Sequence, residues 1–173
     1  MEKFSVHIYT FILPLFVANV IHMLIVKGKI FSVAAKPLSI ALFGAGKTYR
    51  AFLVMPLICG LNTLLFRSLI LHKPNHYWSF SIGVVLGLAY LIGEFPNSFV
   101  KRKLGIPSGQ HSLKYKYLQN IIDKSDSLLA ACGVYFFIAP ITFRMIIWLF
   151  AVSFMIHVIF SWLLVQIKVK KSF

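Results

Sequence analysis

Long apolar stretches alternate with two long, basic polar segments along the chain. Each apolar stretch approaches or exceeds the roughly 20 residues that a helix needs to cross a hydrocarbon core about 30 Å thick. Residues 128–167 are about 40 nearly uninterrupted apolar positions and must turn back, with Pro140 and Arg144 at the turn. We therefore predict an all-α integral membrane bundle, one domain over residues 1–173, with five transmembrane helices. The expected spans are residues 4–26, 51–71, 78–92, 128–143 and 145–167.

The two polar segments, residues 27–50 and 93–127, are expected to be loops on one side of the membrane. Fourteen of the 18 Lys and Arg residues lie in these loops and in the carboxyl-terminal tail. Positive charge collects on the cytoplasmic side of membrane proteins, so both loops should be cytoplasmic and the amino terminus outside. Arg67 and Arg144, which belong to the other side, are expected to extend to the outer interface.

Composition supports a membrane protein. With 59% hydrophobic and 13% charged residues, the chain has too little polar surface for a soluble domain. The net charge is +14, and the basic residues lie between apolar stretches rather than along one helix face. This pattern favours anionic lipid headgroups and phosphorylated substrates over nucleic acid as binding partners. Cys59 and Cys132 lie in apolar stretches without metal-ligand spacing and are interpreted as inert core residues. The oligomeric state stays open.

Acidic residues are scarce and concentrated. Three of the four, Glu94, Asp123 and Asp126, fall in residues 93–127. Asp123 and Asp126 share a face if they lie on a helix, and carboxylate oxygens suit Mg²⁺. Lys101 and Arg102 follow Glu94 by one to two helical turns and are placed to neutralise a transferring phosphoryl group. Exposed ion pairs of little energetic value are an equally good interpretation of the spacing alone.

The first loop ends in Phe43-Gly-Ala-Gly-Lys-Thr-Tyr-Arg50. Its Gly-Lys-Thr is not a nucleotide-binding P-loop, because Ala41 stands where that motif needs glycine. Lys47 and Arg50 remain candidates for holding phosphate oxygens, Arg50 in a bidentate manner. Anchoring of the helix end at the headgroups explains both cations equally well.

Three blocks in this order, FGAGKTYR, GEFPNSFVKRKLGIPSG and DKSDS, resemble the CDP-archaeol synthase family, compact relatives of phosphatidate cytidylyltransferases. The resemblance covers the whole chain. It implies an enzyme that moves a cytidylyl group from CTP to a membrane lipid phosphate, with Mg²⁺ and release of pyrophosphate, at the cytoplasmic face of the cell membrane. By the same resemblance, Lys47, Thr48 and Arg50 contact phosphates, Glu94, Asp123 and Asp126 serve the metal, and Ser98, Lys101 and Arg102 complete the site.

Three features depart from the family pattern: Glu94 stands where Asp is usual, Ala51 stands where Gly usually follows the Arg, and residues 110–119 are more basic than expected for the family. A CDP-alcohol phosphotransferase needs a second acidic pair, which four acidic residues do not allow. A small non-enzymatic carrier or scaffold is the second interpretation, although carriers tend to place their polar groups at mid-membrane. The lipid stays open between isoprenoid ether and acyl ester.

Overall fold

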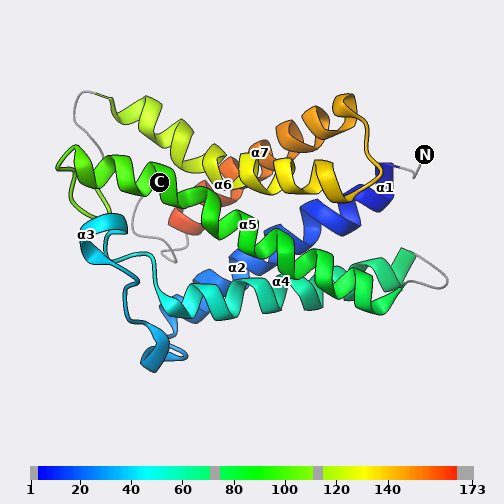
Figure 1. Ribbon diagram of the computed structural model, residues 1–173, viewed down its shortest axis with the longest axis horizontal. Coiled ribbons are helices and arrows are strands. Elements are labelled where there is room, and N and C mark those ends of the chain that lie inside the picture. Colours follow the sequence, from blue (N-terminus) through cyan, green and yellow to red (C-terminus); the bar gives the residue numbers. More distant parts are fainter. Residues whose placement is uncertain (1–3, 71–74, 111–114, 167–173) are drawn as a thin grey trace.

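The computed structural model describes residues 4–70, 75–110 and 115–166, and in these ranges the chain is helical without strands (Figure 1). The first long helix is continuous but contains a π-helical segment; the others are regular. In chain order, the long helices are α1–η1–α2 (Phe4–His7, Ile8–Ile12 and Leu13–Lys27), α4 (Tyr49–Ile70), α5 (His76–Lys103), α6 (Lys116–Ile138) and α7 (Phe143–Gln166), with the short η2 (Ser32–Ala34) and α3 (Ile40–Phe43) in the first connection. The all-α prediction is confirmed.

Within the described residues, four helices are long and apolar enough to cross a membrane: Phe4–Lys27, Tyr49–Ile70, His76–Lys103 and Phe143–Leu163. Helix α6 differs because its amino-terminal half carries Asp123, Lys124 and Asp126. Its apolar half alone is shorter than a bilayer-spanning helix. The fifth span and the orientation therefore stay predictions.

The second polar segment is mostly helix, where a long loop was expected. Helix α5 continues past Glu94 to Lys103, and α6 already begins at Lys116. Pro96 lies inside α5 and removes one backbone hydrogen bond without ending the helix. Side-chain contacts between this end of α5 and α6 hold both helices here, so the candidate residues face each other across a helix pair.

Arg67 does not extend to the outer interface, contrary to the expectation from its position. Its side chain is buried, and it donates hydrogen bonds to Thr10 Oγ1 at 2.9 Å and Ser79 Oγ at 3.1 Å. The hydroxyls of the first helix and of α5 accept hydrogen bonds from the guanidinium inside the bundle, so its donors are paired without contact with water.

Helix α5 is central, packing on α4 along one side and on α6 along another (Figure 1). Its Gly83 and Gly87 lie against α4, as their GxxxG spacing indicates. A Cβ atom at Gly83 would come within 2.6 Å of the Cys59 carbonyl oxygen, and one at Gly87 within 2.7 Å of the Pro56 Cα. The two helix backbones therefore approach as closely as glycine allows.

Gly93 plays the corresponding role between α5 and α6. A Cβ atom there would lie 2.5 Å from the Ala130 Cβ and 2.8 Å from the Asp126 carbonyl oxygen. This contact brings the end of α5 that carries Glu94 against the acidic half of α6. It lies at the end of the bundle where α2 and α5 finish and α4 and α6 begin, opposite α1 (Figure 1).

Candidate active site

Two acidic side chains of α6 meet one amide of α5. Asn97 Nδ2 donates to Asp123 Oδ1 at 2.6 Å and to Asp126 Oδ2 at 2.8 Å. Because both carboxylates contact the same atom, their oxygens converge as the three-residue spacing on a helix predicts. Asn97 was missed in the sequence, although it lies three residues after Glu94 and so on the same face of α5.

Each of two predicted lysines is paired with a predicted acid. Lys101 Nζ contacts the carboxylate of Asp123, and Lys47 Nζ forms an ion pair with Glu94. The second pair ties the first loop to α5. The side chains are partly rather than fully buried. The pairings therefore place four of the predicted residues at one helix junction.

The loop around Gly44 is fixed on the end of α5. Gly44 has a φ of +82°, and a Cβ atom there would lie 2.8 Å from Ser108 Oγ. Ser108 Oγ also accepts a hydrogen bond from the Ala45 backbone N–H at 3.2 Å. Phe43 stacks on Phe95 with ring centroids 4.4 Å apart. These contacts hold Lys47 over the α5–α6 junction.

Thr48 and Arg50 have local roles in the structure. Thr48 Oγ1 accepts from the Ala51 N–H at 3.4 Å, at the start of α4. Arg50 is buried and donates through Nη1 to the Ile30 carbonyl at 3.1 Å, while its Nε has no hydrogen-bond partner in the described part of the chain. The arginine therefore retains a buried donor that a ligand oxygen can satisfy.

A cavity of about 250 Å³ opens at this end of the bundle. Five predicted residues line it together with Lys124: Lys47, Ser98, Lys101, Arg102 and Asp123. Thr48 and Arg50 are not among its lining residues. Glu94 instead joins Asp123 in an adjoining cavity of about 160 Å³. Asp123 thus lines both the strongly cationic cavity and the second one, whereas Asp126 lines neither.

Burial raises the pKa of Asp126, and the negative charge of Glu94 adds to that effect. Hydrogen bonds from Asn97 and from the Ser127 N–H act in the opposite direction without cancelling it. A buried carboxylate of this kind is costly to ionise unless a cation compensates it. Asp126 is therefore arranged to gain from a neighbouring positive charge.

The acidic residues fit a site of the kind Mg²⁺ occupies. Among the described residues, no three His, Cys, Asp or Glu side chains form a group that could hold a metal ion. Mg²⁺, however, is commonly held by one or two carboxylates together with substrate phosphates. Asp123 and Asp126 supply two converging carboxylates, and turning over the Asn97 amide would add a carbonyl oxygen. These oxygen atoms match a site in which two carboxylates bind the ion and the substrate phosphates complete its coordination.

A helical membrane bundle whose cationic cavity adjoins paired carboxylates defines a class: membrane proteins that act on phosphate compounds. The chain belongs to the CDP-archaeol synthase family, whose model, described as CarS-like: CDP-archaeol synthase, matches residues 2–173. Members of this family are CTP-dependent cytidylyltransferases that act on a lipid phosphate. The protein is accordingly an enzyme of that class, and the carrier or scaffold interpretation is set aside.

Two relatives support the assignment. The CDP-archaeol synthase of Pyrobaculum islandicum is 30% identical over 134 residues, covering 76% of this chain and 73% of the relative. The CDP-archaeol synthase of Methanopyrus kandleri is 30% identical over 130 residues, covering 74% of this chain and 68% of the relative. No solved structure matches the chain.

Proposed function

We propose that this enzyme transfers the cytidylyl group of CTP to the phosphate of an isoprenoid ether lipid, forming a CDP-lipid and pyrophosphate. A lipid phosphate oxygen attacks the α-phosphorus of CTP, and the bond from that phosphorus to the oxygen bridging to the β-phosphorus breaks. The carrying observation is that Lys47, Lys101 and Arg102 line one cavity with Asp123. The lipid class follows from the names of the two relatives.

The cations of the larger cavity bind the nucleotide in this proposal. Lys47, Lys101 and Arg102 contact triphosphate oxygens and stabilise the charge that builds on the leaving pyrophosphate. The Ser98 hydroxyl, on the same cavity wall, donates a further hydrogen bond. Outside the cavity lining, Arg50 has a buried Nε donor that a further ligand oxygen can satisfy, and Thr48 accepts a hydrogen bond from the Ala51 N–H at the start of α4.

In the proposal Asp123 and Asp126 would hold Mg²⁺, and Glu94, which the family resemblance assigns to the metal, would add negative charge beside Asp126. When bound, the ion neutralises phosphate charge and polarises the reacting phosphoryl group. The Glu94 side chain, one methylene longer than the Asp that is usual in the family, forms an ion pair with Lys47. Lys101 compensates the charge of Asp123 and lies on the wall of the nucleotide cavity at the same time.

A Mg²⁺ titration of pyrophosphate release tests this assignment. Purified wild type, Asp123→Asn, Asp126→Asn and the double variant are compared in detergent with CTP and a dialkylglyceryl phosphate. Each single variant should lose most activity and the double little more, because residues acting as a unit are not additive. Ser125→Ala, between the two on α6, is the control. Near-normal rates in both single variants would reduce the acids to surface ion pairs worth about 1 kcal/mol or less.

We also propose five spans with the amino terminus outside, which puts the site at the cytoplasmic surface. The charged half of α6 then lies at the headgroup level, where its ionised side chains stay hydrated. Reporter fusions at Asn75 and at the carboxyl terminus should report outside and inside, respectively. Matching signals from the two fusions would contradict this topology.

A further inference from the structure

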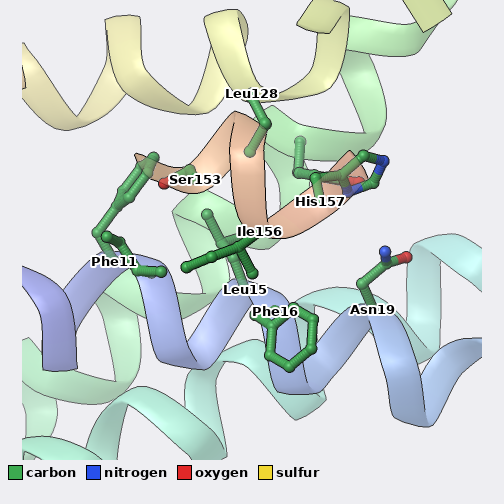
Figure 2. Close-up of a pocket in the computed structure, with 10 residues that line it drawn as sticks. Phe11, Leu15, Phe16, Asn19, Leu128, Ser153, Ile156 and His157 are labelled. Carbon is green, nitrogen blue, oxygen red and sulfur yellow. The ribbon is translucent and has the colours of Figure 1, made fainter. Parts of the chain in front are cut away.

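The connection between the first helix and α4 carries apolar side chains on its outside. Ile30, Phe31 and Val33 are 50%, 63% and 87% exposed, respectively. Apolar residues of the preceding helix are buried instead: Figure 2 shows Phe11 and Leu15 in the interior, between the first helix, α6 and α7. Exposed apolar side chains that lie together mark a surface that contacts protein or membrane. Residues 29–36, here called the projecting turn, form such a surface.

The projecting turn lies beside the first turn of α4. Figure 1 shows the blue ribbon between α2 and α3 extending sideways from the bundle at the end where α4 begins. Arg50, in the first turn of α4, donates a hydrogen bond to the Ile30 carbonyl at 3.1 Å. Because α4 is long and apolar enough to cross a membrane, its first turn lies near the membrane surface. The exposed apolar side chains are therefore at the level of the lipid headgroups.

The backbone of the projecting turn is well defined. Lys29 and Phe31 have φ angles of 55° and 54°, which is the left-handed region that residues other than glycine rarely adopt. The N–H groups of Lys29 and Ile30 donate to the carbonyls of Val26 and Ile25 at 3.2 and 3.1 Å. Unfavourable backbone conformations persist where the surrounding structure holds them, often at functional segments. A hydrogen-bonded turn, rather than an open loop, thus presents the Phe31 ring.

The far end of the projecting turn is joined to the loop that carries the candidate phosphate ligands. The Tyr49 N–H donates to the Lys36 carbonyl at 3.1 Å. Just beyond, the Leu38 N–H donates to the Lys47 carbonyl at 2.8 Å. With the contact from Arg50 to the other end of the turn, both ends are bonded to residues 47–50. A partner that fixes the projecting turn would therefore also fix these residues.

The charge of this region is entirely positive. Lys27, Lys29 and Lys36 are exposed around the apolar side chains. No acidic residue occurs between residues 27 and 50. Lysines next to exposed apolar residues, at the end of a membrane helix, are attracted to anionic lipid headgroups. Charge and apolar exposure together indicate an anionic bilayer surface as the partner.

We propose that the projecting turn docks on the anionic surface of the bilayer, with Phe31 and Val33 inserted below the headgroups and its lysines on lipid phosphates. The lipids bound here are a structural partner and not the substrate, so the docking does not depend on the proposed reaction. Through its hydrogen bonds to residues 47–50, the docked turn holds the candidate phosphate ligands at a fixed depth beside the membrane.

A second copy of the chain is the competing occupant of this surface. In a symmetric dimer the same patch lies on both subunits and contacts itself. Such a contact would bring the three lysines of one copy against those of the other, with no acid in the segment to pair with them. Like charges that face each other across an interface oppose association. The lysines therefore favour lipid over a second copy.

Depth measurements by electron paramagnetic resonance test the docking without turnover. A nitroxide is attached at Val33→Cys in the full chain, which is placed in nanodiscs of phosphatidylcholine, with or without phosphatidylglycerol as the anionic lipid. Cys59 and Cys132 are buried, and the chain without an added cysteine is the blank. Leu104→Cys is the matched control. Leu104 is 68% exposed and follows Glu94 by ten residues along α5, about 15 Å further from the membrane.

In anionic nanodiscs, the ratio of accessibility to O₂ over accessibility to a water-soluble nickel chelate should be about threefold higher at residue 33 than at residue 104. Without anionic lipid this difference should fall by at least half. Equal ratios at the two positions, or equal depth of residue 33 in both lipids, would overturn the proposal. Dipolar coupling between the residue-33 labels of two copies would assign the surface to a dimer and overturn it as well.

Charge variants and CTP binding supply the second readout. Lys29→Gln combined with Lys36→Gln should reduce the depth of residue 33 in anionic nanodiscs to that in neutral ones, whereas Lys103→Gln, at the far end of α5, should leave it unchanged. CTP should protect the wild type against thermal unfolding at about threefold lower concentration in anionic than in neutral nanodiscs, because docking holds residues 47–50. Equal CTP concentrations in the two lipids would refute this coupling. Absence of CTP protection in both would count against the proposed function, and the depth measurement would still decide the docking.

Discussion

Replacing Gly93 by alanine should separate α5 from α6 and disable the site. The added Cβ would lie 2.5 Å from the Ala130 Cβ and 2.8 Å from the Asp126 carbonyl oxygen, both attached to rigid helix backbone. Ordinary carbon contacts need about 3.5 Å, so the helices must part by about 1 Å. The Asn97–Asp126 hydrogen bond, now 2.8 Å, would then exceed hydrogen-bonding distance.

Overpacking of this size costs about 1–3 kcal/mol of stability, and a 1 Å displacement at a reacting centre can cost about a hundredfold in rate. The measurement is pyrophosphate release from CTP, together with thermal unfolding in detergent. Gly133→Ala is the matched control, because a Cβ at Gly133 on α6 meets no atom within 4 Å. That variant should be active and, by helix propensity, slightly more stable. A Gly93→Ala enzyme as active as Gly133→Ala would refute the view that this helix contact positions the carboxylates.

Two further predictions concern single charged residues. Arg50→Lys keeps the positive charge but loses the planar guanidinium group that binds phosphate oxygens in a bidentate manner, so the KM for CTP should rise about tenfold. If the KM for CTP is unchanged both in this variant and in Lys47→Gln, the two residues only anchor the helix end. Burial raises the pKa of Asp126, so the folded protein keeps that proton to higher pH than the unfolded chain, and stability falls as pH rises from about 4 through the raised pKa. The Asp126→Asn variant has no ionisable group at this position and should not lose stability in this way. Its melting temperature should match that of the wild type at low pH and exceed it at pH 8. Parallel pH profiles of the two melting temperatures would contradict the raised pKa of Asp126.

Hydropathy predicted the long helices because a chain inside a membrane must form its backbone hydrogen bonds internally. Apolar segments of sufficient length mark the residues where it does so. The end of α5 was the main error. Polar residues after Gly93 were interpreted as a loop, whereas contacts of Asn97 and Lys101 with α6 keep the helix intact to Lys103. Hydropathy does not register pairing between two polar helix faces, so this extension was not predictable from a single segment.

The sequence pointed to the candidate residues but not to the way in which they are arranged. The Asp123–Asp126 spacing indicated a shared face, which their common contact with Asn97 bears out. The Lys47–Glu94 pair joins residues far apart in sequence, and nothing local to either one indicates the other. His157 and Asn19 look in the sequence like isolated polar residues of apolar helices. In the folded structure both line one cavity together with Glu94 and Asp123, so they border the charged site.

The central claim is transfer of the cytidylyl group, and isotope placement tests it most directly. Purified enzyme, Mg²⁺ and a dialkylglyceryl phosphate are incubated with CTP labelled either at the α- or at the γ-phosphorus, and the products are partitioned between organic solvent and water. The account predicts that α-label moves into the organic phase as CDP-lipid while γ-label stays in water as pyrophosphate. Absence of α-label from the lipid, or appearance of γ-label in it, would contradict the account.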